Sequence, residues 1–234
     1  MSSGIATLWL DRPDRGNALS AEAVRALARA FDDALADPAT HTVVLRGRGK
    51  HFCTGFDLSD LDRETDESLA KRFAALEELL QAVWHAPVRT VALARGRAWG
   101  AGADLFAACD LRVAAPDASL RFPGPAFGIV LGTRRLAETI GWGQARPLVT
   151  EGATLDAQGA LAAGLATHTL EGDEDAWIAS RIAPPVPDRA TMAGLRAAVR
   201  GDHRAADLGS LLASATRPGL VARIRAYREG LAKS

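Results

Sequence analysis

Cysteine, lysine and long apolar runs are all scarce in this chain of 234 residues. The two cysteines, Cys53 and Cys109, have neither C-x-x-C nor zinc-site spacing, which fits a reducing compartment. Only three of the 28 basic residues are lysines, and 28 acidic residues bring the formal net charge to zero. No charge excess therefore favours nucleic acid or an acidic membrane as a partner. No metal-binding constellation is evident either, and no metal site is predicted.

Signals for export or membrane insertion are also missing. The N-terminus, MSSGIATLWLDRP, lacks the basic flank and apolar segment of a signal peptide. No uncharged apolar run approaches the roughly 20 residues of a membrane-spanning helix. These absences predict a soluble, cytoplasmic globular protein that does not bind membranes.

Strand and helix signals alternate along most of the chain. Short β-rich runs predict strands at 5–10, 42–48 and 90–94, and again in the segments LRVAAP and SLRF. Apolar residues at helical spacing predict helices between Ser20, a candidate N-cap, and Asp37, at 67–84 and at 100–110. From Gly132 onward the chain is expected to be mostly helical. This order predicts an α/β fold with largely parallel strands, for which a coiled ββα superhelix is one possible form.

The segment PPVPD at 184–188 is the one clear break in composition. We therefore predict a core at 1–183 and a C-terminal helical region at 184–234. In that region Pro218 is expected to begin a helix. This helix carries an apolar stripe that is expected to pack on a neighbouring element or a partner subunit. The stripe comprises Leu220, Ile224, Tyr227 and Leu231.

Two glycine-containing loops follow predicted strands, where α/β proteins bind ligands. They read RGRGKHFCTGFDL and GRAWGAGADL. The first is not a phosphate-binding loop, because His51 stands where a hydroxyl residue is required, and the second lacks the dinucleotide pattern G-x-G-x-x-G. Each loop alone indicates either close backbone packing or the approach of a ligand. Together, their N–H groups could form an oxyanion hole, typically worth about 3–4 kcal/mol to a reaction that builds charge on a carbonyl oxygen.

Four motifs in order, from about residue 5 to residue 169, carry a family resemblance. They are RPDRGNALS, VVLRGRGKHFCTGFDLSDL, GRAWGAGADLFAACDLRVAAPDASLRFP and TEGATLDAQGALAAGLAT. The combined pattern resembles the crotonase family, also called the enoyl-CoA hydratase/isomerase family. The resemblance implies a coiled ββα core, a C-terminal helical trimerisation region, and a homotrimer or homohexamer. It also implies acyl-CoA thioester substrates, with coenzyme A as part of the substrate and no separate cofactor.

The same resemblance suggests which residues perform the chemistry. It places the two oxyanion donors on the backbone N–H groups of Phe56 and Ala101, the latter usually a glycine, and a catalytic carboxylate on Asp104, where hydratases carry Glu. The alternative for Asp104 is a structural bond to the first turn of its own helix. Further positions are assigned to substrate binding, namely Arg15, Ala18, Cys53, Gly55, Asp57, Leu58, Trp99, Gly100 and Gly124.

One position departs from the family pattern. Gly124 stands where hydratases carry a second Glu, and no acidic residue lies between Asp117 and Glu138. Glu138 and Glu151 are expected to be solvated helix residues. The expected activity is enoyl-CoA hydration or isomerisation with Asp104 as the acid–base group. The alternatives are thioester hydrolysis or decarboxylation, and a non-catalytic acyl-CoA-binding or assembly protein.

Several bulky or cationic residues have two interpretations. Four aromatic residues either line the acyl pocket or belong to the ordinary core. They are Trp99, Phe106, Phe122 and Phe127. Arg12, like Arg15, is a candidate for the coenzyme's phosphates or adenine.

Overall fold

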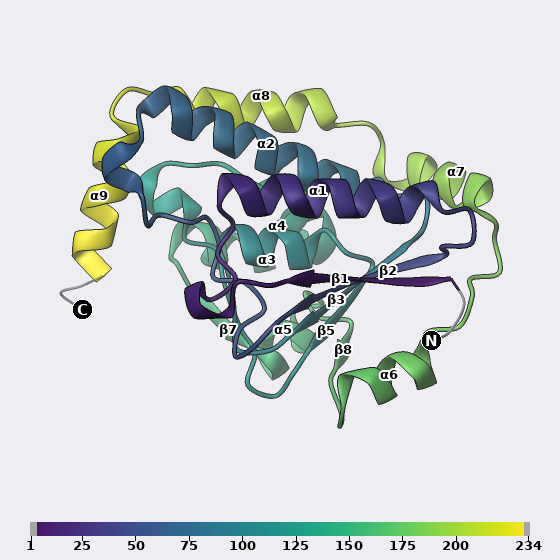
Figure 1. Ribbon diagram of the computed structural model, residues 1–234. Coiled ribbons are helices and arrows are strands. Elements are labelled where there is room, and N and C mark those ends of the chain that lie inside the picture. Colours follow the sequence, from purple (N-terminus) through teal and green to yellow (C-terminus); the bar gives the residue numbers. More distant parts are fainter. Residues whose placement is uncertain (1–3, 232–234) are drawn as a thin grey trace.

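Two sheets organise the molecule in the computed structural model, which describes residues 4–231 (Figure 1). The main sheet is parallel, in the order β1 (Ile5–Leu10), β2 (Thr42–Gly47), β3 (Arg89–Ala94), β5 (Leu111–Ala114) and β8 (His168–Thr169). In the smaller sheet, β6 (Ser119–Arg121) pairs parallel with β4 (Arg97–Trp99) and antiparallel with β7 (Thr154–Asp156). The predicted α/β class with largely parallel strands is confirmed.

Nine α-helices and three short 3-10 turns complete the described residues, 4–231. The helices are α1 (Ala21–Ala36), α2 (Asp66–Trp84), α3 (Ala101–Ala107), α4 (Thr133–Thr150), α5 (Ala157–Ala162), α6 (Glu174–Arg181), α7 (Arg189–Arg200), α8 (Arg204–Ala215) and α9 (Leu220–Leu231). The 3-10 turns are η1 (Pro13–Arg15), η2 (Leu61–Arg63) and η3 (Gly124–Phe127). Within 4–231, no helix is both long and apolar enough to cross a membrane.

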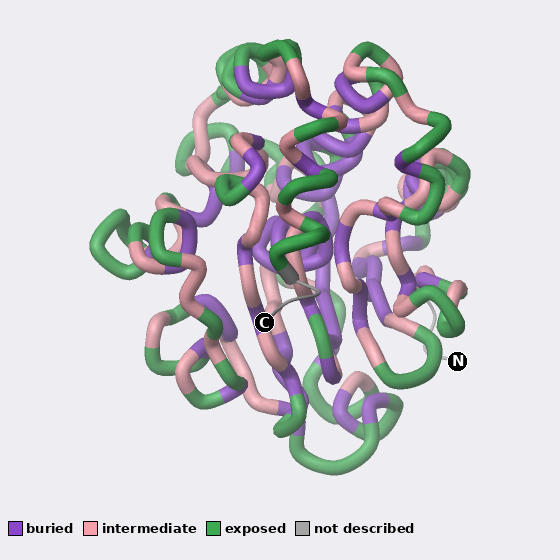
Figure 2. The backbone as a smooth tube through the Cα atoms, turned by 90° about the vertical axis from the view of Figure 1, so that its left-hand side faces the viewer, coloured by how far each residue is buried: buried purple, intermediate pink, exposed green. Residues whose placement is uncertain are grey.

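The strand β2, which lies between β1 and β3, is covered on both faces. Val43 and Leu45 pack into the larger hydrophobic cluster, towards α1, α2 and α3, while Val44 packs into a second cluster with Trp177 of α6. All three β2 side chains are fully buried, as expected for a parallel sheet with helices on both sides. Figure 1 shows α1 and α2 on one side of the sheet and α6 on the other, and Figure 2 shows the buried residues gathered along the strands.

Two helix ends differ from the sequence-based boundaries. The helix expected at 100–110 begins at Ala101 and ends at Ala107. The last helix begins at Leu220 rather than Pro218, because Gly219 has a φ of +80°. The predicted start of the first helix is confirmed, since the Ser20 hydroxyl accepts a hydrogen bond from the Ala23 N–H at 3.1 Å.

The C-terminal helices pack on the preceding chain. Helix α8 packs along α2, and α9 contacts both α2 and η3. Leu220 and Ile224 of the predicted stripe are fully buried, and Tyr227 packs beside the same core. The side chain of Leu231, the fourth member of that stripe, lies outside the described part of the chain.

Candidate active site

The two glycine-containing loops run side by side. The N–H of Cys53 donates to the Arg97 carbonyl at 3.0 Å, and the N–H of Trp99 donates to the Cys53 carbonyl at 2.9 Å. A Cβ atom at Gly102 would lie 2.4 Å from the Cys53 carbonyl oxygen, and one at Gly55 would lie 2.7 Å from that of Trp99. Backbone contact between the loops therefore requires glycine at these two positions.

A third segment, the turn after β1, fixes the direction of the Phe56 amide. The Leu19 N–H donates to the Gly55 carbonyl at 2.7 Å, and the Asp57 N–H donates to the Leu19 carbonyl at 3.1 Å. In this parallel bridge between Leu19 and Phe56, the N–H of Phe56 points away from Leu19.

Asn17 holds that turn in place, a role that sequence reasoning missed. Its φ of +57° is the only positive value among the described non-glycine residues. Its side chain accepts from the Arg12 N–H at 2.9 Å and donates to the carbonyls of Arg48 and His51 at 2.9 and 2.6 Å. The run RGN was visible as a turn signal, but Arg48 and His51 lie more than 30 residues away in the sequence.

Phe56 and Ala101 line one cavity of about 170 Å³. In the described part of the chain, neither backbone N–H donates to a protein acceptor. Ala101 is the first residue of α3, where a helix leaves its N–H groups without intrahelical partners. Two unpaired donors on residues that line one cavity are suited to hold a carbonyl oxygen that gains negative charge.

The same cavity contains the side chain of Asp104. Only 7% of Asp104 is exposed, and its carboxylate accepts no hydrogen bond from the described residues, including the first turn of α3. Burial raises the pKa of Asp104 well above its usual range, Arg135 opposes this rise, and Glu77 adds to it. A buried carboxyl with a raised pKa is suited to accept and return a proton near neutral pH.

A buried ion pair lies near Asp104. Arg135 of α4 donates to both carboxylate oxygens of Glu77 of α2, at 2.7 and 2.5 Å, and these side chains are only 2% and 1% exposed. Asp207 accepts from the same guanidinium at 3.0 Å, and Gln81 donates to Glu77 at 3.0 Å. Sequence analysis did not identify this network, because charged residues on amphipathic helices ordinarily face solvent.

Gly132, at the start of α4, leaves room for the Asp104 carboxylate. A Cβ atom at Gly132 would lie 2.2 Å from Asp104 Oδ1, and Gly132 has a φ of +66°. We expect Gly132→Ala to displace Asp104 and lower turnover by about 10²-fold, because small misplacements of a reacting group are that costly. Gly164→Ala is the matched control, since Gly164 has a φ of +76° but no neighbouring atom within 4 Å. Equal turnover in the two variants would contradict this expectation.

Seven of the twelve sequence-predicted site residues line the cavity, namely Phe56, Leu58, Trp99, Gly100, Ala101, Asp104 and Gly124. Five lie outside its lining, namely Arg15, Ala18, Cys53, Gly55 and Asp57.

Besides Gly55, three of those five have roles in the surrounding structure. Cys53 is fully buried, and burial raises the pKa of its thiol to about 12. Asp57 forms an ion pair with Arg12 at 2.7 Å, and the same guanidinium donates to the Ala18 carbonyl at 2.6 Å. Arg12 is therefore paired within the chain. Arg15 is exposed in η1.

The cavity walls come from segments that are far apart in the sequence. Trp99, Phe122 and Phe127 line it, whereas Phe106 is fully buried and packs edge-on against Phe52. Sequence reasoning did not identify several other lining residues, among them Phe73 of α2, Val149 of α4 and Tyr227 of α9.

Asp104 is the only carboxyl among the described residues that line the cavity. Glu138 and Glu151 instead form ion pairs with Arg134 and Arg146. Gly124 contributes only backbone to the wall, and a Cβ atom there would lie 3.3 Å from the Ile129 carbonyl oxygen.

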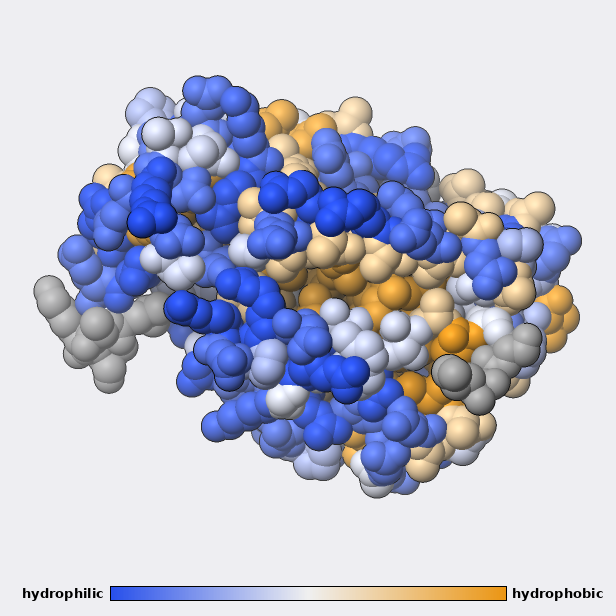
Figure 3. Space-filling view, viewed as in Figure 1, coloured by the Kyte–Doolittle hydropathy of each residue, from blue (hydrophilic) through white to orange (hydrophobic). Residues whose placement is uncertain are grey.

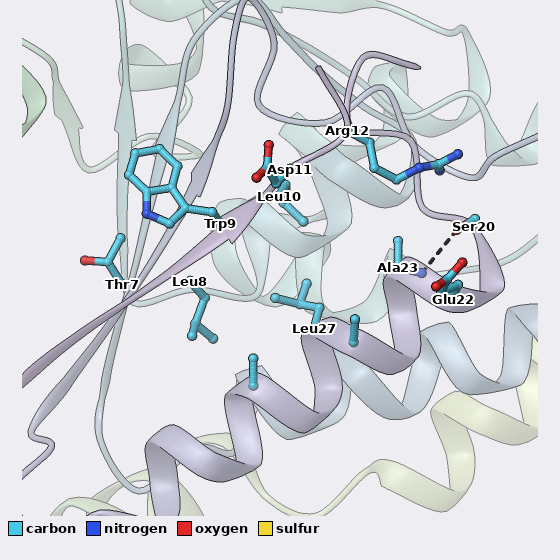
Figure 4. Close-up of a pocket in the computed structure, with 12 residues that line it drawn as sticks. Thr7, Leu8, Trp9, Leu10, Asp11, Arg12, Ser20, Glu22, Ala23 and Leu27 are labelled. Carbon is cyan, nitrogen blue, oxygen red and sulfur yellow. Dashed lines mark hydrogen bonds between the residues drawn. The ribbon is translucent and has the colours of Figure 1, made fainter. Parts of the chain in front are cut away.

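A second, larger cavity of about 610 Å³ lies between β1 and α1 (Figure 4). Leu8 and Leu27 form part of its apolar wall, and Asp11, Arg12 and Glu22 lie at its polar end. Figure 3 shows apolar atoms in a hollow on this side of the molecule. The two carboxyl residues that line this groove, Asp11 and Glu22, are exposed, so the groove lacks the buried carboxyl of the smaller cavity.

Comparison with known proteins finds similarity in both sequence and fold. Residues 1–175 match the family model described as enoyl-CoA hydratase/isomerase. A Mycobacterium tuberculosis protein named "Probable enoyl-CoA hydratase echA6" is 38% identical over 190 residues, covering 78% of this chain and 75% of the relative. Mouse mitochondrial methylglutaconyl-CoA hydratase is 32% identical over 182 residues, covering 76% and 58%. The crystal structure of a Bordetella parapertussis protein named "putative enoyl-CoA hydratase/isomerase" has a TM-score of 0.87 and 40% identity, covering 94% of this chain and 92% of its own.

Proposed function

Because this chain belongs to the enoyl-CoA hydratase/isomerase family, also called the crotonase family, we propose that it binds an acyl-CoA thioester in the Asp104 cavity. The thioester oxygen would lie between the N–H groups of Phe56 and Ala101. The observation that carries this proposal is the presence of two unpaired N–H donors and a buried carboxyl in one cavity. We also propose coenzyme A as part of the substrate with no separate cofactor, a homotrimer or homohexamer as the assembly, and the cytoplasm as its location.

The proposed reaction is enoyl-CoA hydration or double-bond isomerisation through an enolate-like state. The two N–H groups stabilise negative charge on the thioester oxygen, and Asp104 transfers the proton. In isomerisation, Asp104 removes a proton from one carbon and returns it to another. In hydration, water adds its oxygen to C3, and Asp104 takes the proton of that water and delivers it to C2. In both routes the proton passes through Asp104, the one carboxyl among the described residues that line the cavity.

The test is an assay of 2-enoyl-CoA and 3-enoyl-CoA with product separation. Hydration consumes conjugated absorbance and yields 3-hydroxyacyl-CoA, whereas isomerisation of the 3-enoyl thioester generates conjugated absorbance. Release of free thiol would indicate hydrolysis instead. Absence of acyl-CoA binding would contradict the whole proposal.

Gly124 supports a second candidate function, acyl-CoA binding without turnover. The wall formed by η3 supplies no second carboxyl to orient an attacking water. A protein of this kind would bind saturated and unsaturated thioesters alike and leave both unchanged.

The raised pKa of Asp104 also predicts how stability depends on pH. The folded state keeps the Asp104 proton at pH values where the unfolded chain has lost it. The contribution of the protonated Asp104 carboxyl to folding stability is therefore complete below the unfolded pKa, and it is lost as pH rises through the folded pKa. We expect Asp104→Asn, which cannot ionise, to gain stability relative to the wild type as pH rises above about 4, the unfolded pKa of an aspartate.

Urea unfolding at several pH values measures this difference in free energy of unfolding. Glu67→Gln is the control, because Lys71 lowers the pKa of the exposed Glu67 carboxyl. Glu67→Gln should therefore lose stability relative to the wild type as pH rises, and only slightly, since the pair is exposed. Parallel pH curves for the wild type and Asp104→Asn would contradict the expectation.

A further inference from the structure

The Asp104 cavity has few polar side chains. Among the described residues that line it, hydroxyl groups come only from Thr54, Thr133 and Tyr227. The Trp99 indole N–H is already donated to the Ser119 hydroxyl at 2.8 Å. Most of the remaining wall is aromatic, aliphatic or glycine, so a polar atom of a bound acyl group has few partners available.

Tyr227, the only tyrosine in the sequence, lies on the wall that lacks the second carboxyl. Its ring packs against Phe127, with centroids 5.2 Å apart and planes inclined by 50°. Phe127 ends the 3-10 turn η3 that begins at Gly124. This packing positions the phenol beside the segment that carries Gly124.

Helix α9 is anchored independently of any ligand. The Asp66 carboxylate accepts from the N–H groups of Gly219 and Val221 at 2.7 and 2.8 Å. The Arg223 guanidinium donates to the Phe127 carbonyl at 3.1 Å. Ile224, one turn before Tyr227 on the same helix face, is fully buried. The position of the phenol is therefore set by folding, which reduces the entropy that a ligand contact must otherwise overcome.

The Tyr227 hydroxyl is a donor without a hydrogen-bond partner among the described residues. Burial raises the pKa of Tyr227, and Arg121 opposes that rise. The phenol is therefore protonated at neutral pH and can donate to an oxygen atom.

The other two hydroxyls belong to different walls. Thr54 faces the turn after β1, because a Cβ atom at Gly16 would lie 2.7 Å from its Cγ2. Thr133 follows Gly132, the residue against which Asp104 packs. Among the described lining residues, only Tyr227 contributes a hydroxyl from the wall formed by η3 and α9.

We infer that Tyr227 is the second hydrogen-bonding side chain of the site and that its hydroxyl binds the C3 oxygen of a 3-hydroxyacyl-CoA. This inference rests on the proposed function. The thioester oxygen is held by the Phe56 and Ala101 amides, so the oxygen on C3 is the one further polar atom that hydration introduces into the cavity. A buried oxygen there needs a donor, and the tyrosine supplies one that Gly124 does not.

The experiment compares two ligands of equal chain length, a 3-hydroxyacyl-CoA and the saturated acyl-CoA, by calorimetry on the full chain. The Asp104→Asn background prevents turnover, and Tyr227→Phe is added to it because phenylalanine keeps the ring packed on Phe127. We expect the affinity for the 3-hydroxyacyl-CoA to fall about three- to tenfold, with no change for the saturated thioester. The control is Thr133→Val in the same background, which removes the hydroxyl of a different residue that lines the cavity.

Three outcomes would overturn the inference: no change for either ligand in Tyr227→Phe, an equal change for both, or a selective loss in Thr133→Val instead. Failure of the proposed function looks different. In that case neither thioester binds even the wild-type chain, whatever residue stands at position 227.

Discussion

Asp104→Asn is expected to lower turnover of an enoyl-CoA by about 10²- to 10⁴-fold, while the affinity for acyl-CoA persists. Asparagine has nearly the shape of aspartate but can neither accept nor return the proton. The side chain is 7% exposed and has no hydrogen-bond partner among the described residues, so the substitution disrupts no ion pair. Initial rates with 2-enoyl-CoA and 3-enoyl-CoA, together with the dissociation constant of a saturated acyl-CoA, measure the two effects separately.

Glu138→Gln is the matched control for Asp104→Asn. It also converts a carboxylate to an amide, but the Glu138 side chain is one-third exposed and pairs with Arg134. Its turnover should equal that of the wild type. Unchanged turnover in Asp104→Asn would assign the proton transfer to another group, and loss of acyl-CoA binding would assign Asp104 a structural role.

Glu77→Gln is expected to lower the free energy of unfolding by about 3–5 kcal/mol, because it leaves the charge of Arg135 buried with an incomplete set of partners. Arg135 would retain Asp207 at 3.0 Å but lose the two-point contact with the Glu77 carboxylate. Urea denaturation gives this difference.

Glu67→Gln is the control for the Glu77 experiment. Glu67 pairs with Lys71 on the same helix, but both side chains are more than 70% exposed, so the expected loss is much smaller than for Glu77→Gln. The double variant Glu77→Leu/Arg135→Met removes both charges and should be more stable than Glu77→Gln. Similar losses in Glu77→Gln and Glu67→Gln would show that the buried pair contributes no more than an exposed one.

Local signals in the sequence were sufficient for most elements before Gly132 and for part of the site, but β4, β7 and β8 were not predicted. Ser20 was predicted to cap its helix and does so, because an N-cap depends only on neighbouring residues. The two glycine-containing loops were predicted from strand ends and spacing, and the structure brings Phe56, Ala101 and Asp104 to one cavity. The family resemblance, rather than periodicity, singled out those three positions.

Tertiary structure decided what surrounds them. Arg134 and Arg135 are neighbours in the sequence, yet their side chains are 28% and 2% exposed, because only Arg135 points into the interface with α2. Tyr227 reaches the cavity from a helix 123 residues beyond Asp104, and no local pattern distinguishes it from an ordinary core residue. The sequence alone thus determined most of the order of strands and helices before Gly132 and the two loops that meet at the strand ends, since these depend on residues a few positions apart. The burial of Asp104, its charged neighbours and the wall that faces it depend on contacts between distant segments, and these exist only once the helices have packed.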